Sequence, residues 1–345
     1  MASVKRDKPS IVRLAHPLAF TAYLQHLGVP TDGYFRRQGL PTLCKDPNVF
    51  VPLKKAWALF DDAARREDSA LGWHVGRYVG DRGLNAGLLK KLESAPTLYG
   101  ALQRLIELVN SESSHLRLGI VEQRNCILFC TSGYQDMRYE VGCSSSQAYQ
   151  IEAYVDLIQH FTGKSWVPKS IGIQTSEIPA VAKRHFPNCP ILVNQPYAYI
   201  AISRSFLHLP LRRLHLDNSG DCPIVNTNDL SYADSLGLVL KPYLSQGYPS
   251  AKFAASLLDT SVRSLARRLS ECGKTYQSLI DETRFNAATE LLRGTAAPIG
   301  EIGLSIGFND QANFSRLFHR IAGISPRDYR RVQLGRVEQA EYRLN

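Results

Sequence analysis

Two stretches in the last third of the chain carry hydrogen-bonding side chains at helical spacing. In the first, Arg263 and Arg267 are four residues apart and share one helical face. Ser264 and Arg268 share a neighbouring face. The polar side of the second stretch consists of Gln311, Asn313, Arg316 and Arg320. A guanidinium group can donate two hydrogen bonds to guanine, and a Gln or Asn side chain can pair with adenine. Both stretches therefore have the chemistry needed to read base edges in a DNA major groove.

Cations can also bind DNA through its phosphates, without reading the sequence. We expect Arg268, Lys274 and Arg320 to be candidates for such backbone contacts, together with the N-termini of the helices. For Arg268 and Arg320, a solvated or salt-bridged role is an equally good interpretation. Asp310 is expected to cap a helix rather than to read a base.

The second stretch is predicted to form a helix-turn-helix between residues 298 and 330. Gly307 lies at the break between two apolar faces, where a left-handed residue costs little. Ser325, followed by Pro326, opens a third helix with a capping hydroxyl. The two apolar faces consist of Ile299, Ile302, Ile306, Phe314, Leu317, Phe318 and Ile321.

The first stretch has the same plan. Val262, Leu265 and Leu269 form a stripe that we expect to be buried, with the arginines on the opposite side. Asp259 occupies the turn, where its side chain tolerates the left-handed conformation. A long helical pattern from Thr275 to Arg293 joins the two stretches. This half of the chain is therefore predicted to contain two successive helix-turn-helix motifs.

The run from 298 to 330 resembles the C-terminal signature of the AraC/XylS family of bacterial transcription regulators. Its Gly-Phe, Phe-x-Arg-x-Phe and Gly-x-Ser-Pro-x-x-Tyr-Arg elements are in register with that signature. The base-facing positions that the resemblance implies for the first recognition helix are Arg263, Ala266 and Arg267. Those that it implies for the second are Gln311, Asn313 and Arg316. Double-stranded DNA, as an operator or promoter, is the partner that follows.

Two glycines depart from the family pattern. Gly300 and Gly303 lie inside the first helix of the second motif, where alanine is more usual. Each is expected to cost about 0.5–1 kcal/mol of helix stability. The departure predicts a softer second motif.

The composition is that of a globular protein with an anionic partner. The chain has 345 residues, 44% of them hydrophobic and 21% charged, and a formal net charge of +10. This length predicts two domains, and the basic charge is compatible with nucleic acid. No apolar run approaches the ~20 residues of a membrane span, and the N-terminus lacks the apolar core of a signal peptide. We expect a cytoplasmic, nucleoid-associated protein with no membrane partner.

The first two thirds of the chain predict an α+β domain, with helices around a small sheet. Helical patterns cover residues 11–27, 31–39, 53–66, 71–79, 98–109, 144–162 and 178–186. Alternating patterns cover residues 115–122, 126–131, 170–175 and 197–203. The stretch that runs from residues 83–98 through 194–202 to 209–211 resembles the N-terminal effector domain of the ornithine-utilisation-type branch of AraC regulators. The resemblance implies a small-molecule effector but assigns no residue to it.

The domain boundaries follow from these patterns. Residues 1–215 are predicted to bind the effector and to dimerise, and residues 216–229, rich in Asp, Asn, Gly and Pro, read as a linker. Residues 230–335 are predicted to form an all-α DNA-binding domain of seven helices with two helix-turn-helix motifs. Residues 336–345 form a C-terminal tail.

These features predict a sequence-specific transcription regulator, controlled by an effector. The resemblance further implies an activator that works as a homodimer and contacts RNA polymerase. No catalytic residue, metal ligand or cofactor is predicted, because the chain lacks the short motifs of hydrolases, metalloproteases and phosphate-binding loops.

Three alternatives remain open at this point. Cys126 and Cys130 are four residues apart in a strand-like run and share one strand face, so a redox- or metal-responsive regulator is one. A DNA-repair methyltransferase-like protein is the second, although no acceptor-cysteine motif is present. An architectural DNA-binding protein is the third.

Overall fold

The computed structural model describes residues 8–42, 44–81, 90–92, 94–133, 142–211 and 225–333. The chain divides into two compact units. The first spans Ser10–Asp229, and the second contains the chain from Leu230 onward, together with Lys8 and Pro9. Residues 225–229, which are the end of the predicted linker, lie at this division. Residues 216–224 and the predicted tail lie outside the described residues.

The first unit begins with helices around a two-stranded sheet. Its elements are β1 (Ile11–Arg13), α1 (Ala15–His26), α2 (Asp32–Gln38), β2 (Phe50–Pro52), α3 (Leu53–Arg66) and α4 (Leu71–Asp81). The helix predicted from residue 11 begins only at Ala15, because Ile11–Arg13 pairs antiparallel with β2. The rings of Phe20 and Phe60 stack 3.9 Å apart in the core of this part.

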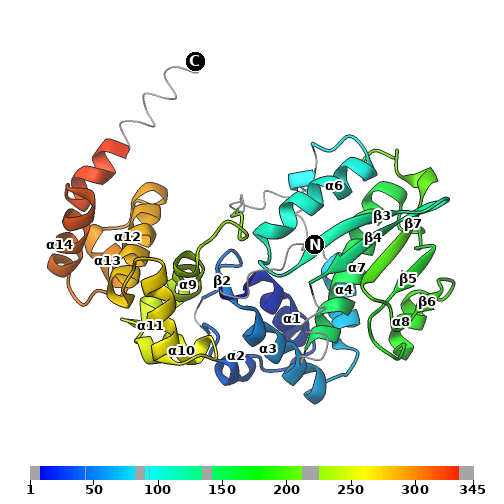
Figure 1. Ribbon diagram of the computed structural model, residues 1–345, viewed down its shortest axis with the longest axis horizontal. Coiled ribbons are helices and arrows are strands. Elements are labelled where there is room, and N and C mark those ends of the chain that lie inside the picture. The colour runs from blue at the N-terminus through cyan, green and yellow to red at the C-terminus, as the bar shows by residue number, and fades with distance from the viewer. Residues whose placement is uncertain are drawn as a thin grey trace. The chain divides into compact units, whose positions relative to one another are not determined.

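The rest of the first unit consists of a five-stranded sheet and the helices around it. Its elements are α6 (Leu98–Leu108), η1 (Val109–Ser111), β3 (Arg117–Glu122), β4 (Cys126–Ser132), α7 (Cys143–Thr162), β5 (Ser170–Gly172), α8 (Ala180–His185), β6 (Ile191–Leu192), β7 (Ala198–Ser203) and η2 (Arg204–Phe206). The strand order is β3-β4-β7-β5-β6, and only the β5–β6 pair is parallel (Figure 1). The predicted hairpin of β3 and β4 is confirmed, as is the α+β class of this unit.

The two faces of the sheet are buried differently. On β4, Ile127 and Phe129 join the main core with apolar residues of α6 and α7. Cys126 and Cys130 lie on the opposite face, in a small cluster with Tyr199. The alternation in the sequence thus predicted the faces of this strand correctly.

Helices α4 and α7 pack closely because glycines line the contact. A Cβ atom at Gly76 would lie 2.4 Å from the Cβ of Glu152 and 2.8 Å from the carbonyl oxygen of Tyr149. Gly72 and Gly80 meet the same helix at similarly short range. The helices run parallel, since successive glycines of α4 face successively later residues of α7.

Gly76→Ala is expected to destabilise the first unit by about 1–3 kcal/mol, because overpacking outweighs the gain in helix propensity. Urea unfolding followed by tryptophan fluorescence measures this, since all three tryptophans, at 57, 73 and 166, belong to the first unit. Gly100→Ala in α6 is the matched control, because its Cβ would have no neighbour closer than 3.5 Å. It should be neutral or stabilising; equal effects of both substitutions would contradict the packing argument.

The described part of the second unit contains helices and no strand. Its elements are α9 (Tyr232–Leu240), η3 (Lys241–Gln246), α10 (Ala251–Leu257), α11 (Val262–Glu271), α12 (Tyr276–Gly294), α13 (Ile299–Ser305), α14 (Gln311–Ala322) and a final helix whose described part covers residues 326–333. The seven predicted helices are confirmed within residues 225–333. The first is shorter than predicted, since the chain tightens to a 3₁₀ helix around Pro242, which has no amide hydrogen to donate.

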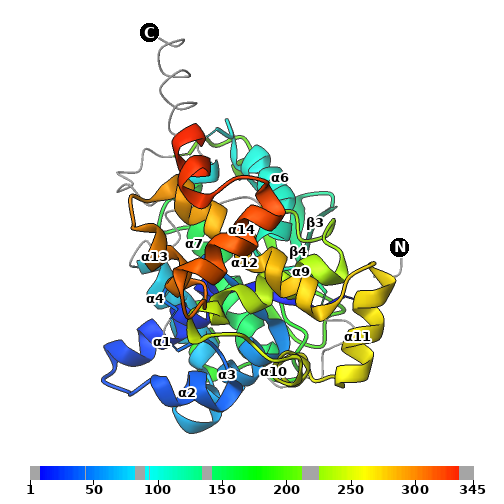
Figure 2. The same ribbon diagram turned by 90° about the vertical axis from the view of Figure 1, so that its left-hand side faces the viewer.

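Helix α12 connects the two helix-turn-helix motifs. It follows α11 in the chain and packs against α13 and α14, whereas α11 packs against α10 and α9 (Figures 1 and 2). In the described part of the chain, no helix has the length and apolar character needed to cross a membrane.

Candidate nucleic-acid interface

Local capping positions the first motif. Ser250 accepts a hydrogen bond from the amide of Phe253 at the start of α10, and Ser261 does the same for Ser264 at the start of α11. Between them, Asp259 has the left-handed conformation that its side chain tolerates, with φ 49°. The predicted turn is confirmed.

The outer face of α11 carries two arginines in the open. Leu265 and Leu269 are completely buried, and they fix the opposite face toward solvent. Arg263 and Arg267 are exposed on that face, and Arg267 forms an ion pair with Glu271 one turn later. Val262 is 44% exposed, so its prediction as a core residue is wrong. Val262 is the first residue of α11, and this end of the apolar stripe extends beyond the core.

The other three residues predicted to contact DNA in this motif are only partly exposed. The Ser264 hydroxyl accepts a hydrogen bond from the Ser261 hydroxyl within the helix cap. Arg268 is half-buried, with its guanidinium 5.5 Å from the centre of the Tyr232 ring. The Lys274 ammonium lies 2.6 Å from a carboxylate oxygen of Glu282. These side chains already have protein partners.

Capping and a glycine turn position the second motif in the same way. Gly307 is left-handed, with φ 83°, and Asp310 caps α14 by accepting a hydrogen bond from the amide of Asn313. Phe314, Leu317 and Phe318 are buried as predicted. Ile321 is 43% exposed, because it lies in the last turn of α14, beyond the contact with α12 and α13.

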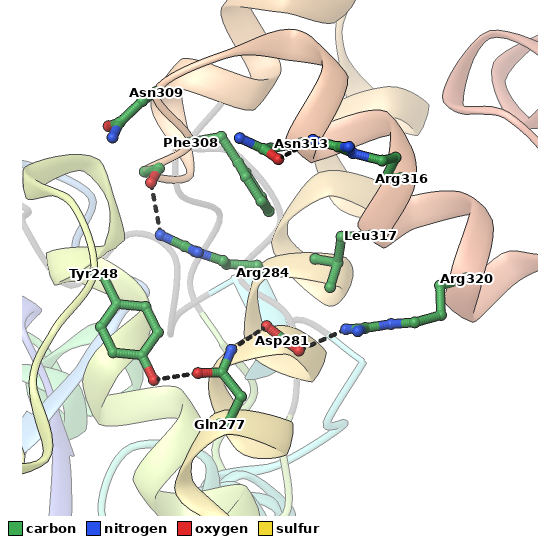
Figure 3. A pocket seen from close by; sticks show the side chains of 11 residues that line it. Tyr248, Gln277, Asp281, Arg284, Phe308, Asn309, Asn313, Arg316, Leu317 and Arg320 are labelled. Carbon is green, nitrogen blue, oxygen red and sulfur yellow. Dashed lines mark hydrogen bonds and ion pairs between the residues drawn. The ribbon is translucent and has the colours of Figure 1, made fainter.

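The polar side chains of α14 form a chain along its outer surface. Asn313 donates to the cap carboxylate of Asp310, and Arg316 donates to the side-chain oxygen of Asn313. Arg320, one turn further, is 65% exposed and lies 2.6 Å from a carboxylate oxygen of Asp281 (Figure 3). The structure thus brings Asn313, Arg316 and Arg320 together at one open cavity of about 500 Å³. Gln311 lies at the first turn of the same helix.

The two unusual glycines of α13 have a packing role. A Cβ atom at Gly303 would lie 3.2 Å from the side chain of Phe314, and one at Gly300 would lie 3.1 Å from the side-chain oxygen of Gln311. The glycines therefore let α14 approach α13 closely. This packing is a reason for their presence that the sequence pattern did not predict.

Three carboxylates beside the candidate DNA face form ion pairs that were not predicted from the sequence. Glu271, Asp281 and Glu282 pair with Arg267, Arg320 and Lys274 respectively. The first pair is four residues apart on one helix, so the spacing alone could have indicated it. The Asp281 pair joins residues 39 positions apart, and only the tertiary structure brings them together.

Glu271→Gln is expected to raise the affinity for any DNA up to about fivefold at low salt. The substitution releases Arg267 and removes a negative charge beside the candidate face, and an exposed ion pair is worth only about 0–1 kcal/mol. The gain should vanish at high salt, because exposed charges are screened. Fluorescence anisotropy with a labelled duplex measures it. Glu107→Gln, which breaks a similar exposed pair with Arg104 in the first unit, should change nothing; weaker binding by the Glu271 variant would contradict the interpretation.

The cysteine pair has the environment of ordinary buried thiols. Cys126 and Cys130 are both buried, and burial raises the pKa of Cys130 to about 11. Such a thiol contains little of the reactive thiolate at neutral pH. Among the described residues, no group of three or more His, Cys, Asp or Glu side chains is placed to hold a metal ion.

The first unit has a polar cavity of about 260 Å³ beside α4 and α7. Glu152 and Asp156 form its buried acidic side, and each has a basic partner: His185 for Glu152, at 2.6 Å, and Lys164 for Asp156, also at 2.6 Å. Burial by itself would raise the pKa of Asp156, but interactions with His160 and Lys164 outweigh it and hold this pKa below its usual range. The cavity therefore presents charges of both signs.

Two helix-turn-helix motifs with exposed arginines and amides on their second helices define a DNA-binding protein of the double helix-turn-helix class. Two family models agree with this description. A helix-turn-helix domain model matches residues 254–332. A model described as the arabinose-binding domain of the AraC transcription regulator, N-terminal, matches residues 28–211, which is more than half of the chain. The chain belongs to the AraC family of transcription regulators.

Curated relatives match short stretches of the chain. The ornithine utilization regulator of Pseudomonas aeruginosa is 46% identical over 83 residues, 24% of each chain. The transcriptional activator RhaS of Shigella boydii is 38% identical over 82 residues, 24% of this chain and 30% of that protein. The chain thus covers about a quarter of the length of these relatives. Among solved structures, the regulator CdpR from Pseudomonas aeruginosa is 19% identical, with a TM-score of 0.38 over 92% of this chain and 98% of that one.

Proposed function

We propose that this regulator binds a specific operator through both motifs at once and that a small molecule bound by the first unit controls it. The observation that carries the proposal is the pair of recognition helices, α11 and α14. Each buries its apolar stripe in the second unit and presents arginines or amides to solvent. Buried stripes fix the orientation of these faces before any DNA arrives.

The exposed side chains divide by role. The base readers are Arg263 and Arg267 on α11 and Gln311, Asn313 and Arg316 on α14. Arg320 and Lys274 would contact phosphates after exchanging their carboxylate partners, and Ser264 would contribute a hydroxyl beside them. Arg268 fits this set least well, because it packs on Tyr232.

The division of labour follows the two units. We assign effector binding and dimerisation to residues 1–215, a linker to 216–229 and DNA binding to 230–335; the contact division at Asp229 and Leu230 supports this assignment. The chain would act on the bacterial nucleoid as an activator, dimerise and engage RNA polymerase. The similarity to the transcriptional activator RhaS supports activation rather than repression. The polar cavity beside α4 and α7 is a candidate location for the effector.

Selection of genomic DNA by the purified full chain tests the proposal. It is carried out at fixed salt, with and without a library of amino acids, amines and fatty acids. A motif of two half-sites about one helical turn apart is the expected result, and a compound that changes occupancy identifies the effector class. Binding without any motif, with only a steep dependence on salt, would contradict the proposal.

A further inference from the structure

Arg284 is a buried cation in the middle of α12, and the sequence pattern predicts no role for it. It is 7% exposed, and among the described residues it forms no ion pair. Its Nε atom has no hydrogen-bond partner among the described residues. Burial lowers the pKa of Arg284, because desolvation disfavours the charged form. A cation buried in this way is costly to retain, so its contacts require an explanation.

Those contacts join three segments of the second unit. The Nη2 atom donates a hydrogen bond of 2.6 Å to the carbonyl oxygen of Gly307, in the turn of the second motif. The guanidinium lies 4.5 Å from the centre of the Phe308 ring, in the same turn, and 5.4 Å from that of Tyr248. Tyr248 belongs to the loop that leads into α10, the first helix of the first motif. Arg284 therefore lies between the two motifs (Figure 3).

Backbone packing brings the same segments together independently of Arg284. A Cβ atom at Gly307 would lie 2.2 Å from the carbonyl oxygen of Leu244 and 2.8 Å from that of Gly247. The turn of the second motif thus rests directly on the chain that enters the first. Tyr276, at the start of α12, donates a hydrogen bond of 2.7 Å to the carbonyl oxygen of Pro249 in this chain.

A line of hydrogen bonds extends the connection to the second recognition helix. Tyr248 donates to Gln277, and Gln277 donates to Asp281, both at 2.9 Å. Asp281 then accepts from Arg320 of α14 at 2.6 Å. These residues, with Arg284, line the cavity drawn in Figure 3. The loop before the first motif is thereby linked, through α12, to the helix that reads DNA in the second.

We propose that Arg284 is a positioning residue that fixes the two recognition helices relative to each other and so sets the operator spacing that the protein accepts. This proposal rests on the proposed function, because it concerns how both motifs reach one duplex. Two readers held rigidly gain from binding together only when the half-sites match their separation. A loosened pair would accept several spacings and would bind the correct one less tightly.

The test uses the full chain and duplexes in which the two half-sites are moved apart or together by one to three base pairs. The wild-type protein is expected to lose at least tenfold in affinity at altered spacings. We call the affinity at the preferred spacing divided by that at an altered spacing the spacing ratio. Arg284→Met, which removes both the hydrogen bond and the charge, should reduce the spacing ratio to threefold or less. Its affinity for a single half-site should stay within twofold of the wild-type value. Arg284→Lys should not restore the ratio, because an ammonium group lacks the planar fork that stacks on both rings.

Matched controls separate positioning from stability. Arg293→Met also removes an arginine from α12 that contacts an aromatic ring, that of Tyr329. This arginine is exposed, and within the described residues it joins α12 to the last helix alone. The substitution should leave the spacing ratio unchanged. Tyr248→Ala is a second probe that should fold even if Arg284→Met does not, since Tyr248 is 45% exposed. It should lower the spacing ratio, as Arg284→Met does.

The outcomes distinguish the two proposals. A wild-type spacing preference that both Arg284→Met and Tyr248→Ala retain would overturn the role of Arg284 and leave the regulator intact. Equal loss of affinity at every spacing and at single half-sites would also overturn it, since that is the effect of lower stability alone. A wild-type protein with no operator preference would overturn the proposed function and the role of Arg284 together.

Discussion

Gly307→Ala is expected to destabilise the second unit by about 2–5 kcal/mol. The left-handed backbone alone costs a non-glycine residue roughly 1–2 kcal/mol. The new methyl group would also stand 2.2 Å from the carbonyl oxygen of Leu244, so the backbone must move. Such overpacking adds about 1–3 kcal/mol. Gly307 is therefore required both for its conformation and for the space that it leaves.

The measurement is urea unfolding of the full chain, observed in two ways. Far-ultraviolet circular dichroism reports on helices of both units, while the tryptophans report only on the first. Gly307→Ala should shift the dichroism transition of the second unit and leave the fluorescence transition in place. Gly323→Ala is the control, because Gly323 is also left-handed, with φ 73°, but has no neighbour within 4 Å of a Cβ atom. It should cost only about 1–2 kcal/mol; equal losses at both glycines would show that the contact with Leu244 has no energetic weight.

Arg316→Ala is expected to remove sequence preference at one operator position. An arginine that pairs with guanine contributes about 1–3 kcal/mol of discrimination, which is roughly 5- to 150-fold. In the free protein Arg316 is exposed and hydrogen-bonded to Asn313, so its loss should leave the fold unchanged. Non-specific affinity should fall only slightly, through the loss of one positive charge.

Competition binding with the selected operator and with single-base variants measures this effect. The variant should bind all bases at one position about equally and retain its preferences elsewhere. Arg65→Ala, which removes another exposed arginine, from α3 of the first unit, should keep the full preference. Unchanged selectivity of the Arg316 variant would contradict the assignment of α14 as a reader of bases.

The two glycines of α13 show that helix propensity describes only part of what a residue does in a motif. Judged by helix propensity alone, Gly300 and Gly303 predict a soft helix. In the structure they admit Gln311 and the Phe314 ring of α14, so their cost in propensity accompanies a close helix contact. Propensity acts within one helix and can be estimated from the sequence, whereas the shape of a contact between two helices cannot.

The sequence by itself determined the elements whose signals are local. Spacing of apolar residues predicted the recognition helices, and capping residues such as Ser261 and Asp310 predicted where they begin. Turn chemistry predicted the left-handed residues Asp259 and Gly307. Each of these signals acts over a few residues along the chain, so the printed order of residues contains it.

Only the tertiary structure decided which charged side chains are open to solvent and which pack against the protein. Arg268 and Arg320 look alike in sequence, yet the first packs on Tyr232 and the second meets Asp281. The same holds for Arg284, whose partners in the loop before α10 and in the turn after α13 lie up to 36 positions away. The ends of the apolar stripes, at Val262 and Ile321, likewise depend on where the neighbouring helices stop. Contacts of this range arise from the packing of whole elements, and a pattern within one helix has no information about them.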